Sequence, residues 1–283
     1  MIITAKVLSD RKLSQADFNI SVSKAKTFTD CKAKYKYCYI EKQPRKEWDH
    51  HKFGKFLHEI FENFYNAKKI NPAQSIEDLA GSFYEQSLPN YILSDEHKQE
   101  ALSILNAYIN NYKEQSNKDI LPSVIGMEKP FNIDIDGKIL LNGIIDRVQV
   151  DYDGVLHVAD YKTTKEKKYL KNDYFQLLTY AFALMLEDKT LDSIRASYIL
   201  LRHNCEFMTK EFTRDEVMEV EGKFKKYAED IYAEKLWRAS PTPLCGYCDY
   251  LELCSDGTAY MDAFNRKKKA KNKQSVKFGL TEW

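Results

Sequence analysis

Residues 124–162 limit the possible folds of this chain more than any other segment. Apolar and polar residues alternate there with a period of two, which is typical of strands with one buried face. Two dipeptides that favour tight turns, Asp136-Gly137 and Asp153-Gly154, divide the segment into three parts. We therefore predict an antiparallel meander of three strands.

Helical patterns lie on both sides of this meander. Helices are predicted over residues 21–40, 53–68, 75–88 and 95–116 before it, and over 173–187 and 214–237 after it. Two further strands are predicted at 194–202 and 206–212. The central order of helix, three strands, helix and strand predicts an α/β fold in which helices pack on a mixed central sheet.

Composition and hydropathy define the broad class of protein. The chain has 283 residues, of which 43% are hydrophobic and 30% are charged, an ordinary globular mixture. No apolar run approaches the roughly 20 residues that span a bilayer. The N-terminus has no positive-then-apolar export signal. We therefore expect a cytoplasmic protein without a membrane partner.

Three charged side chains fall at positions where the strand alternation points to the apolar face. Asp146 shares a face with Val148, and both Asp160 and Lys162 share a face with Val158. An unpaired buried carboxylate costs roughly several kcal/mol, so these groups need partners. One alternative is an Asp–Lys salt bridge at the end of the sheet. The other is a divalent cation such as Mg²⁺ or Mn²⁺, beside which a lysine can orient water or stabilise a phosphate.

Basic residues are concentrated in three segments, although the net charge of the chain is only +1. Residues 24–46 contain eight Lys or Arg against two acids, and residues 162–171 contain five Lys against one Glu. Residues 266–277 contain seven basic residues and no acid. Such patches suit contact with a polyanion, and solvated surface is the alternative. For the last segment we favour a solvated, partly disordered tail.

The six cysteines indicate a metal or cluster site rather than disulfides, because the chain has no export signal. Cys245, Cys248 and Cys254 lie close together near the C-terminus. A tetrahedral zinc ion or a [4Fe–4S] cluster needs four protein ligands. The three neighbouring thiols therefore need a fourth from elsewhere in the chain.

The hairpin sequence GIIDRV…VADYKT resembles the RecB-like branch of the PD-(D/E)xK nuclease superfamily, in which G-x-x-D-R is followed by D-Y-K-T. Three other segments resemble motifs of that branch in the same order. They are SVSKAKTFTDCKAKYKYCYI (an S-x-S…C helix), FGKFLHEIFENFY (a G-x-x-x-H helix) and QLLTY (a Q-x-x-x-Y motif). The resemblance implies a restriction-endonuclease-like core.

The resemblance also implies roles for individual residues. The expected ligands of one or two Mg²⁺ or Mn²⁺ ions are His58, Asp146, Asp160 and the backbone carbonyl of Tyr161. Lys162 is expected to position or activate water, while Gln176 and Tyr180 hold the lysine and the DNA strand. Arg147 is expected to contact phosphate or to brace the site, and a surface salt bridge is an equal alternative.

Some members of that branch, including AddB-type nuclease domains and CRISPR-adaptation nucleases, have one N-terminal cysteine and a C-terminal C-x2-C-x5-C that together bind a [4Fe–4S] cluster. The resemblance therefore implies Cys31 as the partner of Cys245, Cys248 and Cys254. Cys38 is the rival, and zinc in the same thiolates is the alternative metal. Cys205 follows a predicted strand and is expected to be a buried thiol.

We expect a single nuclease domain over residues 1–264 and a basic tail over 265–283. The domain would comprise a helical part (1–118), a catalytic α/β core (119–213), and a helix with a Cys-rich loop that closes onto the core (214–264).

The expected activity is that of a metal-dependent DNA exonuclease acting on single-stranded or end-exposed DNA. Recombination, repair, phage DNA processing and CRISPR adaptation are all compatible, in a bacterial, archaeal or phage-infected cell. Because the chain has no G-x-x-x-x-G-K-[ST] loop, it would act alone or beside a helicase or recombination partner. The alternatives are a non-cleaving DNA-binding subunit with a structural iron–sulfur or zinc site, and an iron–sulfur redox protein.

Overall fold

The computed structural model of the chain describes residues 6–7, 18–170 and 173–277. The chain divides into two compact units: unit 1 (Met1–Val22 and Glu47–Lys226) and unit 2 (Ser23–Lys46 and Tyr227–Trp283). Within the described ranges, no helix combines the length and the apolar character that crossing a membrane requires. The single domain expected over 1–264 stays a prediction, and each unit is described by itself.

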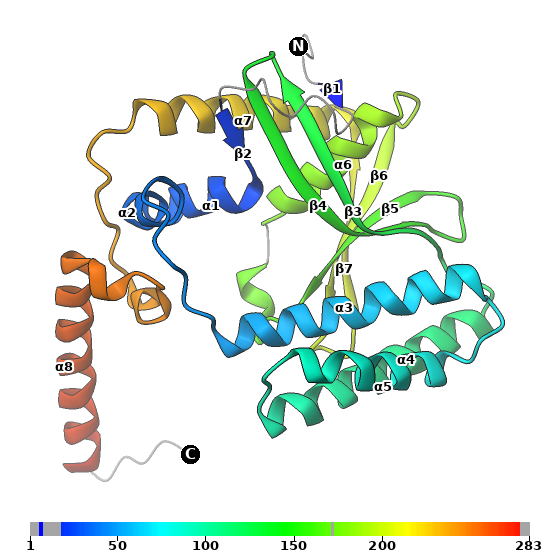
Figure 1. Cartoon of the computed structure of the whole chain (residues 1–283), viewed down its shortest axis with the longest axis horizontal. Helices are drawn as coiled ribbons and strands as arrows, with labels where there is room; N and C mark the ends of the chain where they lie inside the picture. Colours follow the sequence, from blue (N-terminus) through cyan, green and yellow to red (C-terminus); the bar gives the residue numbers. More distant parts are fainter. Residues whose placement is uncertain (1–5, 8–17, 171–172, 278–283) are drawn as a thin grey trace. The chain divides into compact units, whose positions relative to one another are not determined.

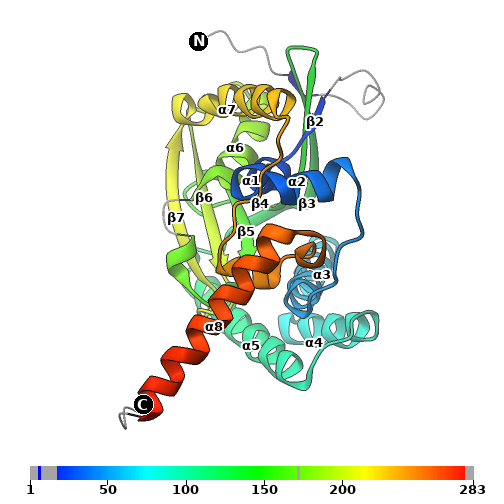
Figure 2. The same ribbon diagram turned by 90° about the vertical axis from the view of Figure 1, so that its left-hand side faces the viewer.

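Unit 1 is built on a mixed sheet (Figure 1), which confirms the predicted α/β class. Its strands are β1 (Lys6–Val7), β2 (Phe18–Ile20), β3 (Ser123–Ile135), β4 (Ile139–Val150), β5 (Leu156–Lys162), β6 (Ser193–Leu200) and β7 (Glu206–Thr213). The order is β1-β3-β4-β5-β6-β7, and β2 pairs in parallel with β4. The predicted meander is confirmed, since β3, β4 and β5 pair antiparallel, whereas β5 and β6 are parallel. At the far end of this order, β7 pairs only with β6 among the described strands (Figure 2).

Helices cover both faces of this sheet. They are α3 (Asp49–Ile70), α4 (Ile76–Ser87), α5 (Asp95–Asn117), α6 (Phe175–Glu187) and α7 (Arg214–Ala233), the last of which continues into unit 2. Tyr161 of β5 and Ile199 of β6 are buried in one cluster with apolar residues of α3, α4 and α5. Residues of β5 alternate between faces, so Asp160 points the opposite way, toward Tyr180 of α6.

The first predicted turn shows why glycine and aspartate occur there. Asp136 and Gly137 both have positive φ, 57° and 70°, between the paired residues Ile135 and Ile139. The Gly137 N–H donates to the Asp134 carboxylate at 2.7 Å, which closes the turn. Residues that adopt the left-handed conformation at low cost therefore position the β3–β4 hairpin.

Several predicted boundaries are accurate and others are not. The helices predicted at 75–88, 95–116 and 173–187 lie within two residues of α4, α5 and α6. Helix α3 begins at Asp49, four residues before the predicted start, because its first turn contains no apolar residue to reveal the periodicity. Helix α7 ends at Ala233 rather than at residue 237, and the Glu234 side chain accepts hydrogen bonds from the next backbone N–H groups, of Leu236 and Trp237.

Unit 2 contains α1 (Val22–Asp30), which begins at the unit boundary, α2 (Lys32–Tyr35) with a π-helical turn at Lys36–Ile40, and α8 (Ser255–Lys277). The single helix predicted over 21–40 is wrong, because Cys31 has extended backbone (φ −160°, ψ 113°) and separates α1 from α2. The aromatic rings of Tyr35 and Trp237 stack with centroids 5.8 Å apart. The prediction of a partly disordered tail is also wrong as far as residue 277, since α8 continues to Lys277. Residues 278–283 lie outside the described residues.

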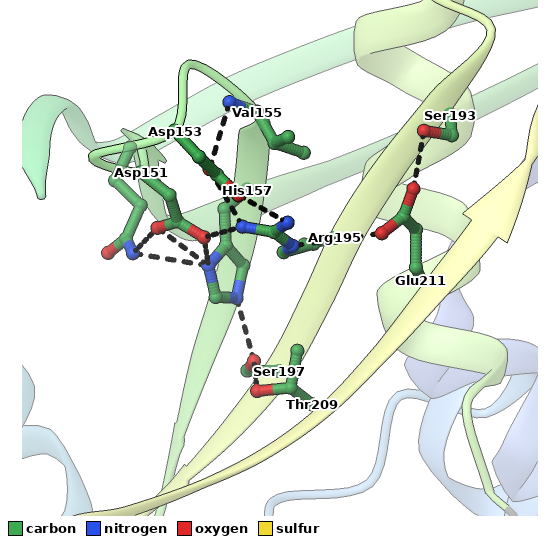
Figure 3. A network of polar contacts seen from close by, with 10 residues as sticks. Asp151, Asp153, Val155, His157, Ser193, Arg195, Ser197, Thr209 and Glu211 are labelled. Carbon is green, nitrogen blue, oxygen red and sulfur yellow. Dashed lines mark hydrogen bonds and ion pairs between the residues drawn. The ribbon is translucent and has the colours of Figure 1, made fainter.

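A polar network fastens the β4–β5 turn to β6 and β7 (Figure 3). His157 lies between Asp151 and Ser197, with Nδ1 3.0 Å from Asp151 Oδ2 and Nε2 2.7 Å from Ser197 Oγ. Arg195 also donates to Asp151, at 3.0 Å. The order Ser, His and Asp is that of a hydrolase triad, but Ser197 is fully buried and also contacts the Thr209 hydroxyl at 2.7 Å. No substrate can reach this hydroxyl, so the network is structural.

We expect the ionised Asp151 carboxylate to stabilise the fold by an amount that is lost in acid. Burial alone would raise the pKa of this carboxyl, but hydrogen bonds from His157, Gln149 and Arg195 outweigh burial and lower the pKa to about 2. Because the pKa of Asp151 is lower in the folded than in the unfolded protein, its ionised form stabilises the fold at any pH above the unfolded value of about 3.8. This stabilisation is lost as the pH falls from 3.8 toward 2. After allowance for solvent screening we expect about 1 kcal/mol.

We predict that Asp151→Asn lowers the free energy of unfolding by about 1 kcal/mol at pH 7 and reduces its decline below about pH 4. Urea unfolding of both proteins across this pH range measures the effect. Asp119→Asn, in the loop before β3, is the control and should behave like the wild type. Equal pH dependence in the wild type and Asp151→Asn would contradict the prediction.

Candidate active site

The pairing of β4 with β5 brings two carboxylates together on one face of the sheet. Arg147 is opposite Ala159 and Val148 is opposite Val158, so the preceding residue, Asp146, comes beside Asp160. Both carboxylates are buried, with 7% of Asp146 and 1% of Asp160 exposed.

A hydrogen-bonded chain from α6 reaches both carboxylates. The Tyr180 hydroxyl lies 3.2 Å from Asp160 Oδ1 and 3.5 Å from Asp146 Oδ1, so it can donate to either. Gln176, one helical turn earlier, donates to the Tyr180 oxygen at 2.8 Å. The four-residue spacing expected from the sequence therefore places both side chains on one face of α6.

Lys162 lies at the other end of this series of hydrogen bonds. Its Nζ is 2.6 Å from Asp160 Oδ2 and donates to Gln176 Oε1 at 3.0 Å. The ammonium also lies 5.4 Å from the ring centroid of Tyr198, which is fully buried. The Asp–Lys ion pair considered from the sequence is thus present at Asp160, but it leaves Asp146 without a cationic side chain from the same strand pair.

His58 of α3 lies close to Asp146. Its Nε2 is 3.2 Å from the Tyr161 carbonyl oxygen, and its Nδ1 is 3.5 Å from Asp146 Oδ2. The Tyr161 N–H donates to the same carboxylate oxygen at 3.1 Å. The imidazole, the carboxylate and the carbonyl expected to bind metal therefore lie together.

Glu128 of β3 was missed by sequence reasoning. It lies between Met127 and Lys129, which pair with Arg147 and Ile145, and it is therefore opposite Asp146. Its Oε1 is 3.4 Å from His58 Nδ1, and its φ of 43° is unusual for a side chain on a strand. No motif accompanies Glu128 in the sequence, so only the β3–β4 pairing could have identified it.

One ligand atom each from His58, Glu128 and Asp146 lies within 4.8 Å of the others. Carboxylate and carbonyl oxygens with one imidazole are donors that suit Mg²⁺ or Mn²⁺. Asp160 is not part of this trio, and its oxygens contact Lys162 and Tyr180.

The electrostatics of the site indicate an excess of negative charge. Burial, and then the nearby Asp160 carboxylate, raise the pKa of Asp146 to about 7. Burial alone would lower the pKa of His58, but a hydrogen bond to Glu128 and the neighbouring carboxylates outweigh it and raise the pKa to about 9. A divalent cation among these groups would relieve the repulsion between the carboxylates.

Arg147 lies on the opposite face of β4 and is only 2% exposed. Its Nη1 donates to the hydroxyl oxygens of Tyr108 at 2.6 Å and Tyr161 at 3.4 Å. This burial excludes a surface salt bridge and matches the bracing alternative, because Tyr161 also contacts His58 and Asp146 through its backbone. A phosphate contact by Arg147 stays a prediction that no distance supports.

Four cysteines of unit 2 line one cavity, of about 320 Å³ including the space at its mouth: Cys31, Cys245, Cys248 and Cys254. Cys38 is not among its lining residues, and its sulfur accepts a hydrogen bond from Arg45 at 2.8 Å. Cys205 is buried in unit 1, as expected, and burial raises the pKa of its thiol to about 12. The structure thus groups the four cysteines implied by the resemblance.

Backbone N–H groups point at three of these sulfurs. They belong to Ser240, Thr242 and Gly257, which lie 3.3–3.5 Å from the sulfurs of Cys31, Cys245 and Cys254 respectively. Such donors stabilise thiolates that bind metal. Across the described residues, no three of the sulfurs lie within 4.8 Å of one another, whereas a tetrahedral zinc ion holds its sulfurs about 3.8 Å apart.

Comparison with known proteins agrees with this geometry. The family model of the PD-(D/E)XK nuclease superfamily matches residues 19–255. An ATP-dependent helicase/deoxyribonuclease subunit of Streptococcus agalactiae serotype Ia is 28% identical over 199 residues, which are 64% of this chain and 18% of that protein. The corresponding subunit of Streptococcus uberis is 29% identical over 153 residues, 50% of this chain and 13% of that protein.

The chain thus spans less than a fifth of the length of these curated relatives. A solved structure from Eubacterium rectale aligns over 90% of this chain and 93% of its own, with 12% identity and a TM-score of 0.49. The family match covers most of the chain and includes the hairpin with both carboxylates and the lysine. The chain therefore belongs to the PD-(D/E)XK nuclease superfamily.

Proposed function

We propose that this protein is a metal-dependent DNA exonuclease that hydrolyses phosphodiester bonds in single-stranded or end-exposed DNA. The observation that carries the proposal is the placement of Asp146, Asp160 and Lys162 on one sheet face beside His58. The helicase/deoxyribonuclease subunits that match the chain support DNA as the substrate and a helicase as a partner. Recombination, repair, phage DNA processing and CRISPR adaptation all suit such an activity.

The metal would be held by oxygen and imidazole ligands. We assign His58, Asp146, Asp160 and the Tyr161 carbonyl to Mg²⁺ or Mn²⁺, and we add Glu128 because it lies beside His58 and Asp146. When bound, the ion would polarise a phosphate oxygen and lower the pKa of water.

The protein side chains would supply orientation and charge. Lys162 carries its ammonium at the edge of the carboxylate pair, where it can position the attacking water or stabilise charge on the phosphate. Gln176 fixes the ammonium through its side-chain oxygen, and Tyr180 fixes the carboxylates through its hydroxyl. This preorganisation keeps the reacting groups in place before DNA arrives. Arg147 would act as a brace by donating a hydrogen bond to the Tyr161 hydroxyl on the face of the sheet opposite the carboxylates.

For unit 2 we propose a [4Fe–4S] cluster with a structural role, held by Cys31, Cys245, Cys248 and Cys254. The shared cavity and the N–H groups directed at three of the sulfurs support it. Zinc in the same thiolates is the alternative. Because Cys31 is more than two hundred residues from Cys245, a cluster would join two distant segments of the chain.

Replacement of the lysine tests the nuclease activity. We predict that Lys162→Ala lowers the cleavage of end-labelled DNA at least about 100-fold, because the group that positions water is lost. Single- and double-stranded DNA with Mn²⁺ are the substrates, and Lys189→Ala, an exposed lysine after α6, is the control that should retain activity. Equal cleavage by wild type and Lys162→Ala would indicate a contaminant, and cleavage by neither would favour a DNA-binding subunit.

Replacement of the glutamate tests the metal site. We predict that Glu128→Gln weakens Mn²⁺ binding about tenfold, since it removes a charged oxygen ligand while preserving side-chain shape. Titration calorimetry of the DNA-free protein measures the affinity. Glu85→Gln, an exposed position on α4, should bind Mn²⁺ like the wild type. Unchanged affinity in Glu128→Gln would remove this residue from the metal site.

The cysteines provide a matched pair of variants. We predict that protein purified without oxygen is brown and contains about four iron atoms per chain, as a [4Fe–4S] cluster requires. Cys31→Ser should lose most of the iron, whereas Cys38→Ser should retain it, because only Cys31 lines the cavity. A colourless protein with stoichiometric zinc would contradict the cluster.

A further inference from the structure

The guanidinium of Arg147 lies in a cage of aromatic rings on the face of β4 opposite the candidate active site. Its central carbon is 4.7 Å from the ring centroid of Tyr65 and 5.9 Å from that of Phe207. The Tyr108 hydroxyl, which accepts from Arg147, is 2.5 Å from the Tyr65 hydroxyl. The cage therefore draws residues from α3, α5, β4 and β7.

No negative charge in this cage balances the guanidinium. Within the described part of the chain, Arg147 makes no ion pair with a carboxylate, and its polar side-chain contacts are tyrosine hydroxyls. The groups that surround the guanidinium are tyrosine hydroxyls and aromatic rings, and none of them is a carboxylate. The rings and hydroxyls can supply only dipoles and π faces.

A full positive charge at 2% exposure is costly without a counter-charge. The cost is increased because the Arg147 Nε–H is buried and has no hydrogen-bond acceptor among the described residues. This combination of an unbalanced charge and an unused donor indicates a site that lacks an anionic partner from the protein.

A small cavity adjoins this guanidinium. Arg147 lines it together with Asn111, Gln115 and Tyr112 of α5 and with residues of the cage. Its lining contains no Asp or Glu, and it does contain several amide and hydroxyl donors. The cavity measures about 260 Å³ including the space at its mouth. Because Arg147 itself is only 2% exposed, an ion that reaches its guanidinium through this cavity has to be small.

We propose that this cavity binds a single halide-sized anion, such as chloride, as the counter-ion of Arg147. The anion would accept a hydrogen bond from the unused Nε–H or approach the guanidinium from the cavity. It would neutralise a buried positive charge on β4, the strand that also carries Asp146. Such a site would exist whether or not the protein cleaves DNA. It would make the stability of unit 1 depend on the anion in solution.

Bromide provides a direct test. In crystals of the full chain soaked in sodium bromide, we expect an anomalous peak in contact with the Arg147 guanidinium. Thermal unfolding in sodium chloride and in sodium gluconate at equal ionic strength is the second measurement. We expect chloride to raise the Tm by about 3 °C, the shift for a site that is about 90% occupied.

A built-in carboxylate should replace the anion. Gln115→Glu places a negative charge of nearly the same size in the cavity lining, so it should raise the Tm in gluconate and abolish the difference between the two salts. Gln86→Glu, which adds the same charge at an exposed position on α4, should keep the wild-type chloride effect. If Gln115→Glu does not fold, the bromide soak and the comparison of Tm in the two salts, both made on the wild type, decide whether the anion site exists.

Two results would overturn the proposal. The absence of a bromide peak, with equal Tm in both salts, would mean that the cavity holds water only. A bromide peak without any chloride effect on unfolding would mean adventitious halide at crystal concentration.

Discussion

The antiparallel register of β4 and β5 is the constraint on which the rest of unit 1 depends. With Val148 opposite Val158, both Asp146 and Asp160 point toward α6, and Arg147 points toward α3 and α5. A shift of one residue in this pairing would turn a carboxylate into the aromatic cluster of the opposite face. The buried valines and the tight turns therefore do more than build a sheet, since they select the face on which each charge lies.

The paired strands β4 and β5 thus bury opposite charges on the two faces of the sheet. On the α6 face, Lys162 pairs with Asp160, and Asp146 accepts a hydrogen bond from the Tyr161 N–H; burial and the neighbouring Asp160 carboxylate raise the pKa of Asp146. On the other face, neutral phenols surround Arg147. Charges in a low-dielectric interior need nearby compensation. The proposed cation on one face and the proposed small anion on the other would supply it. Tyr161 connects the two faces, because its backbone contacts His58 and Asp146 while its hydroxyl accepts from Arg147.

Unit 2 is organised around its cysteines. Cys31 interrupts what would otherwise be one helix, and its extended backbone places the sulfur in the cavity shared with Cys245 and two other cysteines. A helical residue at this position would continue α1, so the break is the local cost of bringing distant thiols together. Cys38, only seven residues later, lies in the π-helical turn, contacts Arg45 and is not among the residues that line this cavity. This division between two nearby cysteines agrees with the cluster proposed for unit 2.

Local patterns in the sequence determined the strands β3 to β7, their turns, most helices and the face on which each of these strand residues lies, because these follow from backbone periodicity; the short strands β1 and β2 were not predicted. Local patterns also identified Asp146, Asp160 and Lys162, since a charge at an apolar position is visible within a single strand. Glu128 had no such signal, because its role depends on the pairing of β3 with β4. The family resemblance, rather than a local pattern, implied the set of four cysteines, whereas nothing in the sequence indicated the contacts of the Arg147 cage, which join segments far apart in the chain. Only the tertiary structure decided those contacts, because periodicity within one segment carries no information about which distant segment packs against it.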